Sequence, residues 1–310
     1  MATANFESAI LPGELVVGDH NEELLTGRGA IPAGMSRGLE KRDWEKHPLC
    51  GAPYQAPLPA SVQVPRDEWD ERIEEMERTE TRLSDLVRKA GLPCKDQNGT
   101  NYCWINAPVH CVEVMLIVQN QMDPDGKPWI LSPASVGCKI KNFRNQGGWG
   151  GEGLEYIVEH GVVPVKLWPA NAINRQYDTA AAWIEAGKFT VKEWYDLRAN
   201  NFGDKMSAHF HRKPTADGYN WWSHEVTGYD PVIVGNSVRD AQRRHIEADC
   251  LRRGIDKELR DAALELAASK YGARERNSWS MSYGEQGFFI LTESKATPSD
   301  CCSPNVVLAM

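Results

Sequence analysis

The cysteine at position 103 has neighbours of the types that nucleophilic catalysis uses. It stands directly before Trp104 in the stretch QNGTNYCW, six residues after Gln97. A thiolate is a strong nucleophile and a neutral thiol is a weak one, so a catalytic cysteine needs surroundings that favour its anion. The amino terminus of a helix provides them through the helix dipole. The segment 103–121 is apolar nearly all round, which predicts a buried, central helix that begins at Cys103.

Acyl transfer to a thiolate also requires a base, a group that orients the base and donors for the oxyanion. His224 lies at the start of an alternating, strand-like segment, and Asn277 lies at the start of another, in RNSWS. Gln97 precedes the turn-forming residues NGTN and supplies a side-chain amide. Each requirement has a candidate, so two interpretations compete. Cys103 is either a nucleophile or an ordinary core cysteine.

The composition of the chain excludes several classes of protein. Its 310 residues carry a net charge of −8, which argues against general nucleic-acid binding. No apolar run is long enough to predict a transmembrane helix, and the amino terminus lacks the pattern of a secretory signal. Eight cysteines are too few for a disulfide-built scaffold, so we expect cytoplasmic synthesis with reduced thiols. The final compartment is not predicted.

The elements around the candidate residues are mostly helical in the first half of the chain and strand-like in the second. We expect an extended N-terminal arm over 1–60, which contains seven glycines and six prolines. A helix is predicted at 66–90, with an apolar face and a stop at Gly91 and Pro93. Shorter helices are predicted in LSPASVGC and EGLEYIVEHG. A charged helical segment covers 236–272, and residues 165–215 give no clear prediction.

Five blocks of the sequence resemble the papain-like cysteine peptidases of the C1 type, in the order that this family has them. They are DQNGTNYCW, LSPASVGC, NQGGWGGEGLEYIVEHGVVP, SHEVTGYD and RNSWSMSYGEQGFFILTES, and together they cover most of 92–295. The resemblance implies an α+β fold of two lobes. A helical lobe holds the nucleophile helix, an antiparallel, barrel-like sheet forms the other lobe, and the active site lies between them. Residues 61–310 would form this peptidase domain, with helical insertions at 66–90 and 236–272.

The resemblance also implies a role for each matching residue. Cys103 is the nucleophile, His224 the base and acid, and Asn277 the residue that orients the imidazole. Gln97 donates to the oxyanion together with the backbone N–H of Cys103. Supporting and substrate-binding positions are implied for Trp279, which shields the Asn–His hydrogen bond, and for Trp104, Gly147, Gly148 and Trp222. No metal or organic cofactor is implied.

Some residues depart from the pattern of the family. Thr100, Asn101 and Tyr102 replace the usual Cys-Gly-Ser, and Asn145 stands where the cysteine that pairs with the first of these is expected. Both ends of that disulfide are therefore missing. Glu225 follows the histidine where a small residue is usual, which puts the substrate specificity in doubt. The N-terminal arm does not match the usual inhibitory pro-segment, so a zymogen is not predicted.

Three hypotheses about function follow. The first is a peptidase that cleaves peptide bonds in a peptide or protein substrate. The second is a structural or interaction protein of a larger assembly, such as a phage or viral particle, in which the arm 1–60 and the insertion 236–272 contact protein partners. The third and weakest is a peptidoglycan amide hydrolase or an acyl transferase. A metal site at His209 and His211 has no third ligand near by in the sequence and is disfavoured.

Overall fold

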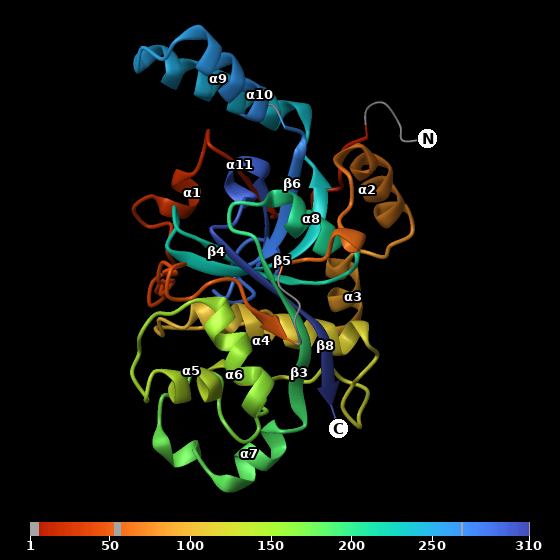
Figure 1. Ribbon diagram of the computed structural model, residues 1–310, viewed down its shortest axis with the longest axis vertical. Helices are drawn as coiled ribbons and strands as arrows, with labels where there is room; N and C mark the ends of the chain where they lie inside the picture. Colours follow the sequence, from red (N-terminus) through yellow and green to blue (C-terminus); the bar gives the residue numbers. More distant parts are fainter. Residues whose placement is uncertain (1–5, 53–56, 268, 310) are drawn as a thin grey trace.

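An open sheet of eight strands runs through the computed structural model, which describes residues 6–52, 57–267 and 269–309 (Figure 1). The strand order is β1-β7-β6-β5-β4-β8-β3-β2. Only β1 and β7 pair in parallel, and the other neighbouring pairs are antiparallel. The bounds are β1 Leu15–Val17, β2 Gly51–Ala52, β3 Phe189–Leu197, β4 Thr215–Tyr219, β5 His224–Ile233, β6 Tyr271–Arg276, β7 Phe288–Thr292 and β8 Asp300–Ala309. The α+β prediction is confirmed, with a sheet that does not close into a barrel.

Helices flank this sheet and build a second lobe below it in Figure 1. Their bounds are α1 Glu23–Thr26, α2 Trp69–Arg78, α3 Leu83–Ala90, α4 Cys103–Val118, α5 Pro133–Ile140, α6 Gly150–His160, α7 Ala180–Ala186, α8 Phe202–Phe210, α9 Asn236–Arg252, α10 Lys257–Ala267 and α11 Glu293–Ala296. Short 3-10 turns lie at 60–62, 66–68 and 175–177. No helix in the described ranges is both long enough and apolar enough to cross a membrane.

The helix α4 lies between the two lobes because almost all of its side chains are apolar. Every residue from Cys103 to Leu116 is buried, and the helix packs on β5, β8 and α6. Its side chains share one hydrophobic core with α5, α6 and β3. A second core lies between α2, α8 and the strands β5 to β7. The first residue of α4 is therefore buried in the interior of the molecule.

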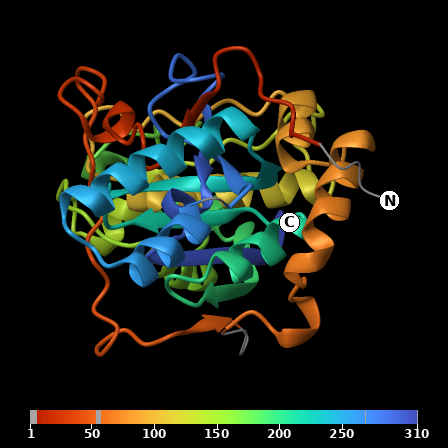
Figure 2. The ribbon, with the colours of Figure 1, turned by 90° about the horizontal axis from the view of Figure 1, so that it is seen from above.

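The predicted helix at 66–90 is two helices, α2 and α3. The chain breaks at 79–82, where Glu80 has a left-handed backbone (φ 51°) that a helix cannot continue through. Residues 165–215, which gave no clear prediction, contain α7, β3 and α8. The insertion 236–272 contains two helices, α9 and α10, which pack on each other and project from the sheet lobe (Figures 1 and 2).

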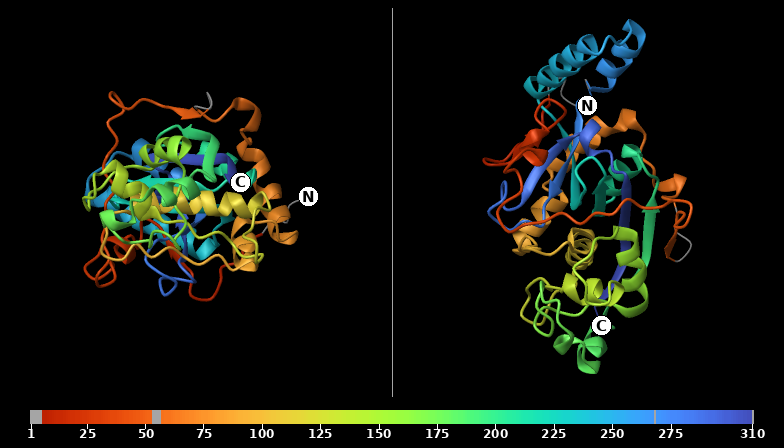
Figure 3. Two further views of the ribbon diagram at one scale, coloured as in Figure 1. Left: turned by 90° about the horizontal axis from the view of Figure 1, so that it is seen from below. Right: turned by 90° about the vertical axis from the view of Figure 1, so that its left-hand side faces the viewer.

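The described residues of the N-terminal arm lie along the molecule. The arm contributes both edge strands of the sheet, since β1 pairs with β7 at one edge and β2 pairs with β3 at the other. Between these edges it crosses the molecule at the level where the two lobes meet (Figure 3, right). Residues 1–5 and 53–56 of the predicted arm lie outside the described residues.

Candidate active site

Cys103 is the first residue of α4, and its side chain is fully buried. The sulfur accepts a hydrogen bond of 3.2 Å from the backbone N–H of Gly38, a residue of the arm. Burial raises the pKa of the Cys103 thiol to about 12, and the charge of Glu225 adds to this, while three backbone N–H groups oppose it. The thiol is therefore neutral at pH 7 while the arm covers it.

His224 and Asn277 form a buried pair. His224 is the first residue of β5, and its Nε2 lies 2.8 Å from Asn277 Oδ1. Because an amide oxygen can only accept a hydrogen bond, Nε2 carries the proton and Nδ1 keeps its lone pair. Nδ1 has no hydrogen-bond partner among the described residues, Cys103 included. Burial lowers the pKa of His224 to about 3, so the imidazole is neutral as well.

Two indole rings enclose the imidazole. The ring of Trp279 lies 4.6 Å from that of His224 and is tilted by only 30°, and the ring of Trp222 meets it edge-on at 4.7 Å. Trp222 is fixed in turn by its indole N–H, which donates to Leu25 O at 3.0 Å. The rings keep water from the His–Asn hydrogen bond, which strengthens it.

The side chain of Gln97 is held at both ends of its amide. Its Nε2 donates to Ser36 O at 2.8 Å and to Thr100 O at 2.9 Å. Its Oε1 accepts from the hydroxyl of Ser278 at 2.5 Å. Ser278 directly follows Asn277, so the same short segment positions both the side chain of Asn277 and the amide of Gln97.

The arm pairs with the backbone of Gly148. Gly148 N–H donates to Gly38 O at 3.0 Å, and Glu40 N–H donates to Gly148 O at 2.9 Å. This is a parallel bridge in which Leu39 lies opposite Gly148. A Cβ on Gly147 would lie 2.4 Å from Gly38 O, and one on Gly148 would lie 2.7 Å from the ring of Trp104 beneath it. Only glycines let an extended chain approach so closely.

The residues 36–40, called the blocking segment from here on, thus form hydrogen bonds with three groups: the amide of Gln97, the sulfur of Cys103 and the backbone of Gly148. Ser36 O accepts a hydrogen bond from the amide of Gln97, and Gly38 N–H donates one to the sulfur. Gly38 O and Glu40 N–H are hydrogen-bonded to the backbone of Gly148. The segment contacts the sulfur through a backbone N–H, that of Gly38.

A family sequence profile with the description "Papain family cysteine protease" matches residues 84–306. The chain belongs to the papain family of cysteine proteases. Comparison with curated protein sequences gives no match. The match includes α3 and the insertion with α9 and α10, and it begins after the arm.

Solved structures of papain-family enzymes are similar to this chain at low identity. Xylellain, a cysteine protease from Xylella fastidiosa, is 14% identical with a TM-score of 0.48, and the match covers 69% of this chain and 83% of that one. Digestive procathepsin L 3 of Tenebrio molitor is 16% identical with a TM-score of 0.46, covering 71% and 68%. The procathepsin B S9 from Trypanosoma congolense is 11% identical with a TM-score of 0.49, covering 74% and 77%.

Thr100 and Asn145 stand where the resemblance implied two paired cysteines, and Asn145 is hydrogen-bonded to the residues on either side of Thr100. Asn101 N–H donates to Asn145 Oδ1 at 2.6 Å, and Asn101 Nδ2 donates to Asn145 O at 3.1 Å. Asn145 Nδ2 also donates to Gly99 O at 3.2 Å. The loop before the nucleophile and the loop before Gly148 are therefore joined without a covalent bond, which suits a chain whose eight cysteines are all free.

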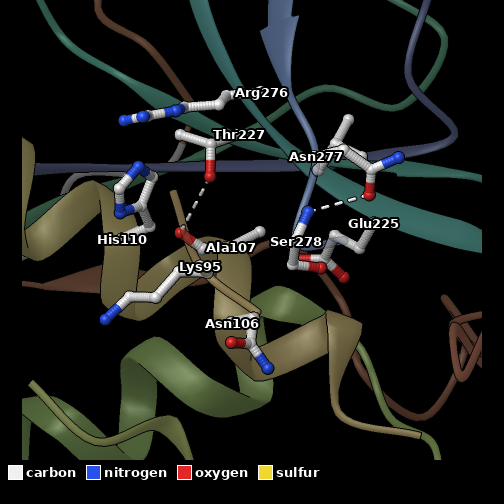
Figure 4. A pocket seen from close by; sticks show the side chains of 10 residues that line it. Lys95, Asn106, Ala107, His110, Glu225, Thr227, Arg276, Asn277 and Ser278 are labelled. Atoms are coloured by element: carbon white, nitrogen blue, oxygen red, sulfur yellow. Dashed lines mark hydrogen bonds between the residues drawn. The ribbon is translucent and has the colours of Figure 1, made fainter. Parts of the chain in front are cut away.

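Beneath the site lies a void that is too tight to hold a water molecule (Figure 4). Three elements converge on it: α4 through Asn106 and His110, β5 through Glu225, and the chain after β6 through Asn277 (Figure 4). On its floor, His110 joins Glu113 at 2.9 Å and Tyr229 at 2.7 Å. This network fixes α4 against the sheet and leaves no room for substrate.

The described residues hold no group of three His, Cys, Asp or Glu side chains that could bind a metal ion. His209 and His211 lie in and just after α8 rather than on an extended strand, and they diverge. His209 Nε2 lies 2.9 Å from Thr215 Oγ1 in the interior, and His211 Nε2 lies 3.0 Å from Val62 O at the surface.

The structure brings Gln97, Cys103, His224 and Asn277 to one place, together with Trp279, Trp104, Gly147, Gly148 and Trp222. Asn277 differs in detail from its prediction, because it follows the strand β6 rather than beginning one. Sequence reasoning missed Ser278, Ser36 and Gly38. Ser278 follows Asn277 in the quoted motif and had a signal, but nothing distinguishes Gly38 from the six other glycines of the arm.

Proposed function

We propose that this chain cleaves peptide bonds with Cys103 as nucleophile, His224 as base and acid, Asn277 as orienting residue and Gln97 as oxyanion donor. The observation that carries the proposal is the hydrogen bond of 2.8 Å between His224 Nε2 and Asn277 Oδ1. It leaves Nδ1 as the free basic nitrogen of the imidazole. The backbone N–H of the next residue, Glu225, is hydrogen-bonded to Cys103 at the start of α4.

The chemistry proceeds in two halves. In the first, His224 Nδ1 takes the thiol proton, Cys103 Sγ bonds to the carbonyl carbon, and the C–N bond breaks as Nδ1 protonates the leaving amine. In the second, Nδ1 takes a proton from water, whose oxygen attacks the thioester carbon. The S–C bond then breaks and the thiol regains its proton. In both halves, the oxyanion receives hydrogen bonds from Gln97 Nε2 and the backbone N–H of Cys103.

The arm makes the intact chain a resting form. A thiol with a pKa of about 12 and an imidazole with a pKa of about 3 are both neutral at pH 7, so no thiolate–imidazolium pair exists while both are buried. Burial is the first cause of each shift. Displacement of the blocking segment therefore restores the acidity of the thiol and the basicity of the imidazole together.

A cleavage assay tests this proposal. Gly38→Ala displaces the blocking segment, because a Cβ there would lie 1.9 Å from Asn101 O, a backbone atom. We expect the full-length variant to cleave peptides from a mixed library and Cys103→Ala in the same background to cleave none. Cys111→Ala is the matched control, since it changes a buried cysteine two turns further along α4 and should retain activity. Equal cleavage with and without Cys103 contradicts the proposal.

The same assay separates the other hypotheses. A structural or interaction protein gives no cleavage and no acyl-enzyme after the segment is displaced. A peptidoglycan amide hydrolase or acyl transferase forms an acyl-enzyme at Cys103, but it does so from cell-wall fragments or transfers the acyl group to an added amine. Mass spectrometry of the intact protein distinguishes these outcomes.

A further inference from the structure

Leu39 fills a site on the face of the sheet beside Cys103. The residue lies opposite Gly148, where the backbone of an extended substrate would pair. A Cβ built on Gly218 in β4 would meet Leu39 Cδ1 at 3.1 Å and the Cβ of Asp300 at 3.4 Å. The side chain of Leu39 therefore occupies space that exists because residue 218 is glycine, and Asp300 borders that space.

Three acidic side chains lie on this face of the sheet, and they form what we call the acidic site: Asp196, Glu225 and Asp300. The strand register puts them on one face, because cross-strand partners point the same way. Gly218 pairs with both Glu225 and Asp300, and Asp196 pairs with Cys302, which lies two residues after Asp300 on the same strand. That face is the one on which Leu39 lies.

The arm supplies a cation to the acidic site. Arg42 follows Leu39 by three residues, and its guanidinium forms two hydrogen bonds to Asp196, of 2.9 and 2.7 Å, and one of 3.1 Å to Asp300. Its side chain is 2% exposed. Among the described residues, Arg42 is the only cation that forms an ion pair with either aspartate. When the arm is displaced, the positive charge of Arg42 is therefore removed from the acidic site.

Glu225 is the residue of the acidic site whose carboxylate forms no ion pair with a described cation. The residue is 1% exposed, and neither carboxylate oxygen accepts a hydrogen bond of good geometry from the described residues. A Cβ on Gly150, at the start of α6, would lie 2.3 Å from Oε1. Burial raises the pKa of this carboxyl well above its usual range, and Asp300 and Asp217 add to the rise. A buried carboxyl without a partner is costly, and it gains most from a donor that enters the site.

We propose that the acidic site binds the guanidinium of a substrate arginine, carried by the residue that pairs with Gly148. In the intact chain, Leu39 fills the space and Arg42 supplies the positive charge. When the arm is displaced, the side chain of the substrate arginine provides both. Arginine rather than lysine fits because Asp196 already binds a guanidinium through two parallel hydrogen bonds. This inference rests on the proposed function, since it names the substrate of the same site.

The experiment uses full-length Gly38→Ala and three reagents for Cys103. Two are peptide chloromethyl ketones that differ only in the residue before the reactive one, arginine or leucine, and the third is iodoacetamide. We expect the arginine reagent to label Cys103 about tenfold faster than the leucine reagent. The ratio of the two rates cancels any difference in thiol reactivity between variants.

Substitutions in the acidic site test whether its carboxylates cause the preference for the arginine reagent. Asp300→Asn and Glu225→Gln, each in the Gly38→Ala background, should lower the arginine-to-leucine ratio toward one. Glu185→Gln, a surface carboxylate, should leave the ratio unchanged. Should these variants fail to fold, the ratio in Gly38→Ala, and its decrease when free arginine amide but not leucine amide is added, still test the proposal.

Three results overturn it, and they are distinguishable. If the leucine reagent labels as fast as the arginine reagent, this inference fails and the proposed function stands. If iodoacetamide labels Cys103 and neither peptide reagent does, the proposed function fails, and this inference with it. If no reagent labels Gly38→Ala faster than the intact chain, the arm does not exclude ligands from the acidic site.

Discussion

Gly38 donates its backbone N–H to the sulfur of Cys103 at 3.2 Å. A residue of the arm is thus hydrogen-bonded to a cysteine that lies 65 residues away in the sequence. The close approach depends on the absence of a side chain at position 38. This makes the closed state sensitive to a single methyl group.

Gly38→Ala should expose Cys103. Its Cβ would overlap Asn101 O, and overpacking of this kind costs about 1–3 kcal/mol. That energy moves the closed–open equilibrium by about fivefold to about 150-fold. The measurement is the rate of alkylation of Cys103 by iodoacetamide at pH 6. Gly187→Ala is the control, because a Cβ there meets its neighbours at 3.5 Å and does not crowd them. An unchanged rate in Gly38→Ala contradicts the role of the segment.

The pH dependence of alkylation should differ between the intact chain and Gly38→Ala. A thiol pKa raised to about 12 means that the intact chain reacts slowly at pH 7 and faster only as the pH rises toward 12. The lowered pKa of His224, about 3, provides no imidazolium above that pH to help ionise the thiol. In Gly38→Ala the thiol and the imidazole are no longer buried by the arm. The thiolate–imidazolium pair therefore forms, and the alkylation rate is already high below pH 7. Coincident pH profiles of the two proteins would contradict this.

Ser278 should act only through Gln97. The Ser278 hydroxyl holds Gln97 Oε1, so in the Gly38→Ala background Ser278→Ala should lower kcat about tenfold with little change in KM. Gln97→Ala removes the oxyanion donor and should lower kcat by about 10²–10³. The double variant should match Gln97→Ala alone, because a positioning residue has no effect once its target is gone. Ser282→Ala, in an exposed hydroxyl pair with Ser280, is the control. Additive losses would assign Ser278 a separate role.

A buried ion cluster should carry much of the stability of the sheet lobe. Lys205 is fully buried between Asp217, at 3.1 Å, and Glu275. Lys205→Met leaves these carboxylates without their cation, and we expect it to lower the free energy of unfolding by about 3–5 kcal/mol. Lys188→Met removes a half-exposed pair with Glu185 and should cost no more than about 1 kcal/mol. Urea denaturation measures both. Equal losses would mean that burial of the cluster is unimportant.

The sequence predicted the residues whose chemistry or periodicity is local. Cys103 was predicted to begin a buried helix, and it does, because most of the fourteen residues from Cys103 to Leu116 are apolar and all fourteen are buried. The carboxyl terminus of α6 follows from a glycine stop at Gly161. The two helices α2 and α3 were merged, because nothing in the charged residues 79–82 excludes a helix.

The elements that depend on distant pairing were not predictable. The strand β3 and the carboxyl-terminal strand β8 form one long ladder, and each alone lacks a clear alternating pattern. The strand β1 has three residues and exists only because β7 offers it an edge. The blocking segment is the extreme case, because its conformation is set by Gly148, Gln97 and Cys103, all of them more than fifty residues away.

The two edge strands give the blocking segment an unusual attachment. β1 lies before it and β2 after it, and they belong to opposite edges of one sheet. The inhibitor is therefore a loop tethered at both ends, and its effective concentration at Cys103 is set by the span between those edges rather than by the amount of protein. Dilution does not open such an enzyme. A single cut within 36–40 would leave two fragments that both remain attached to the sheet.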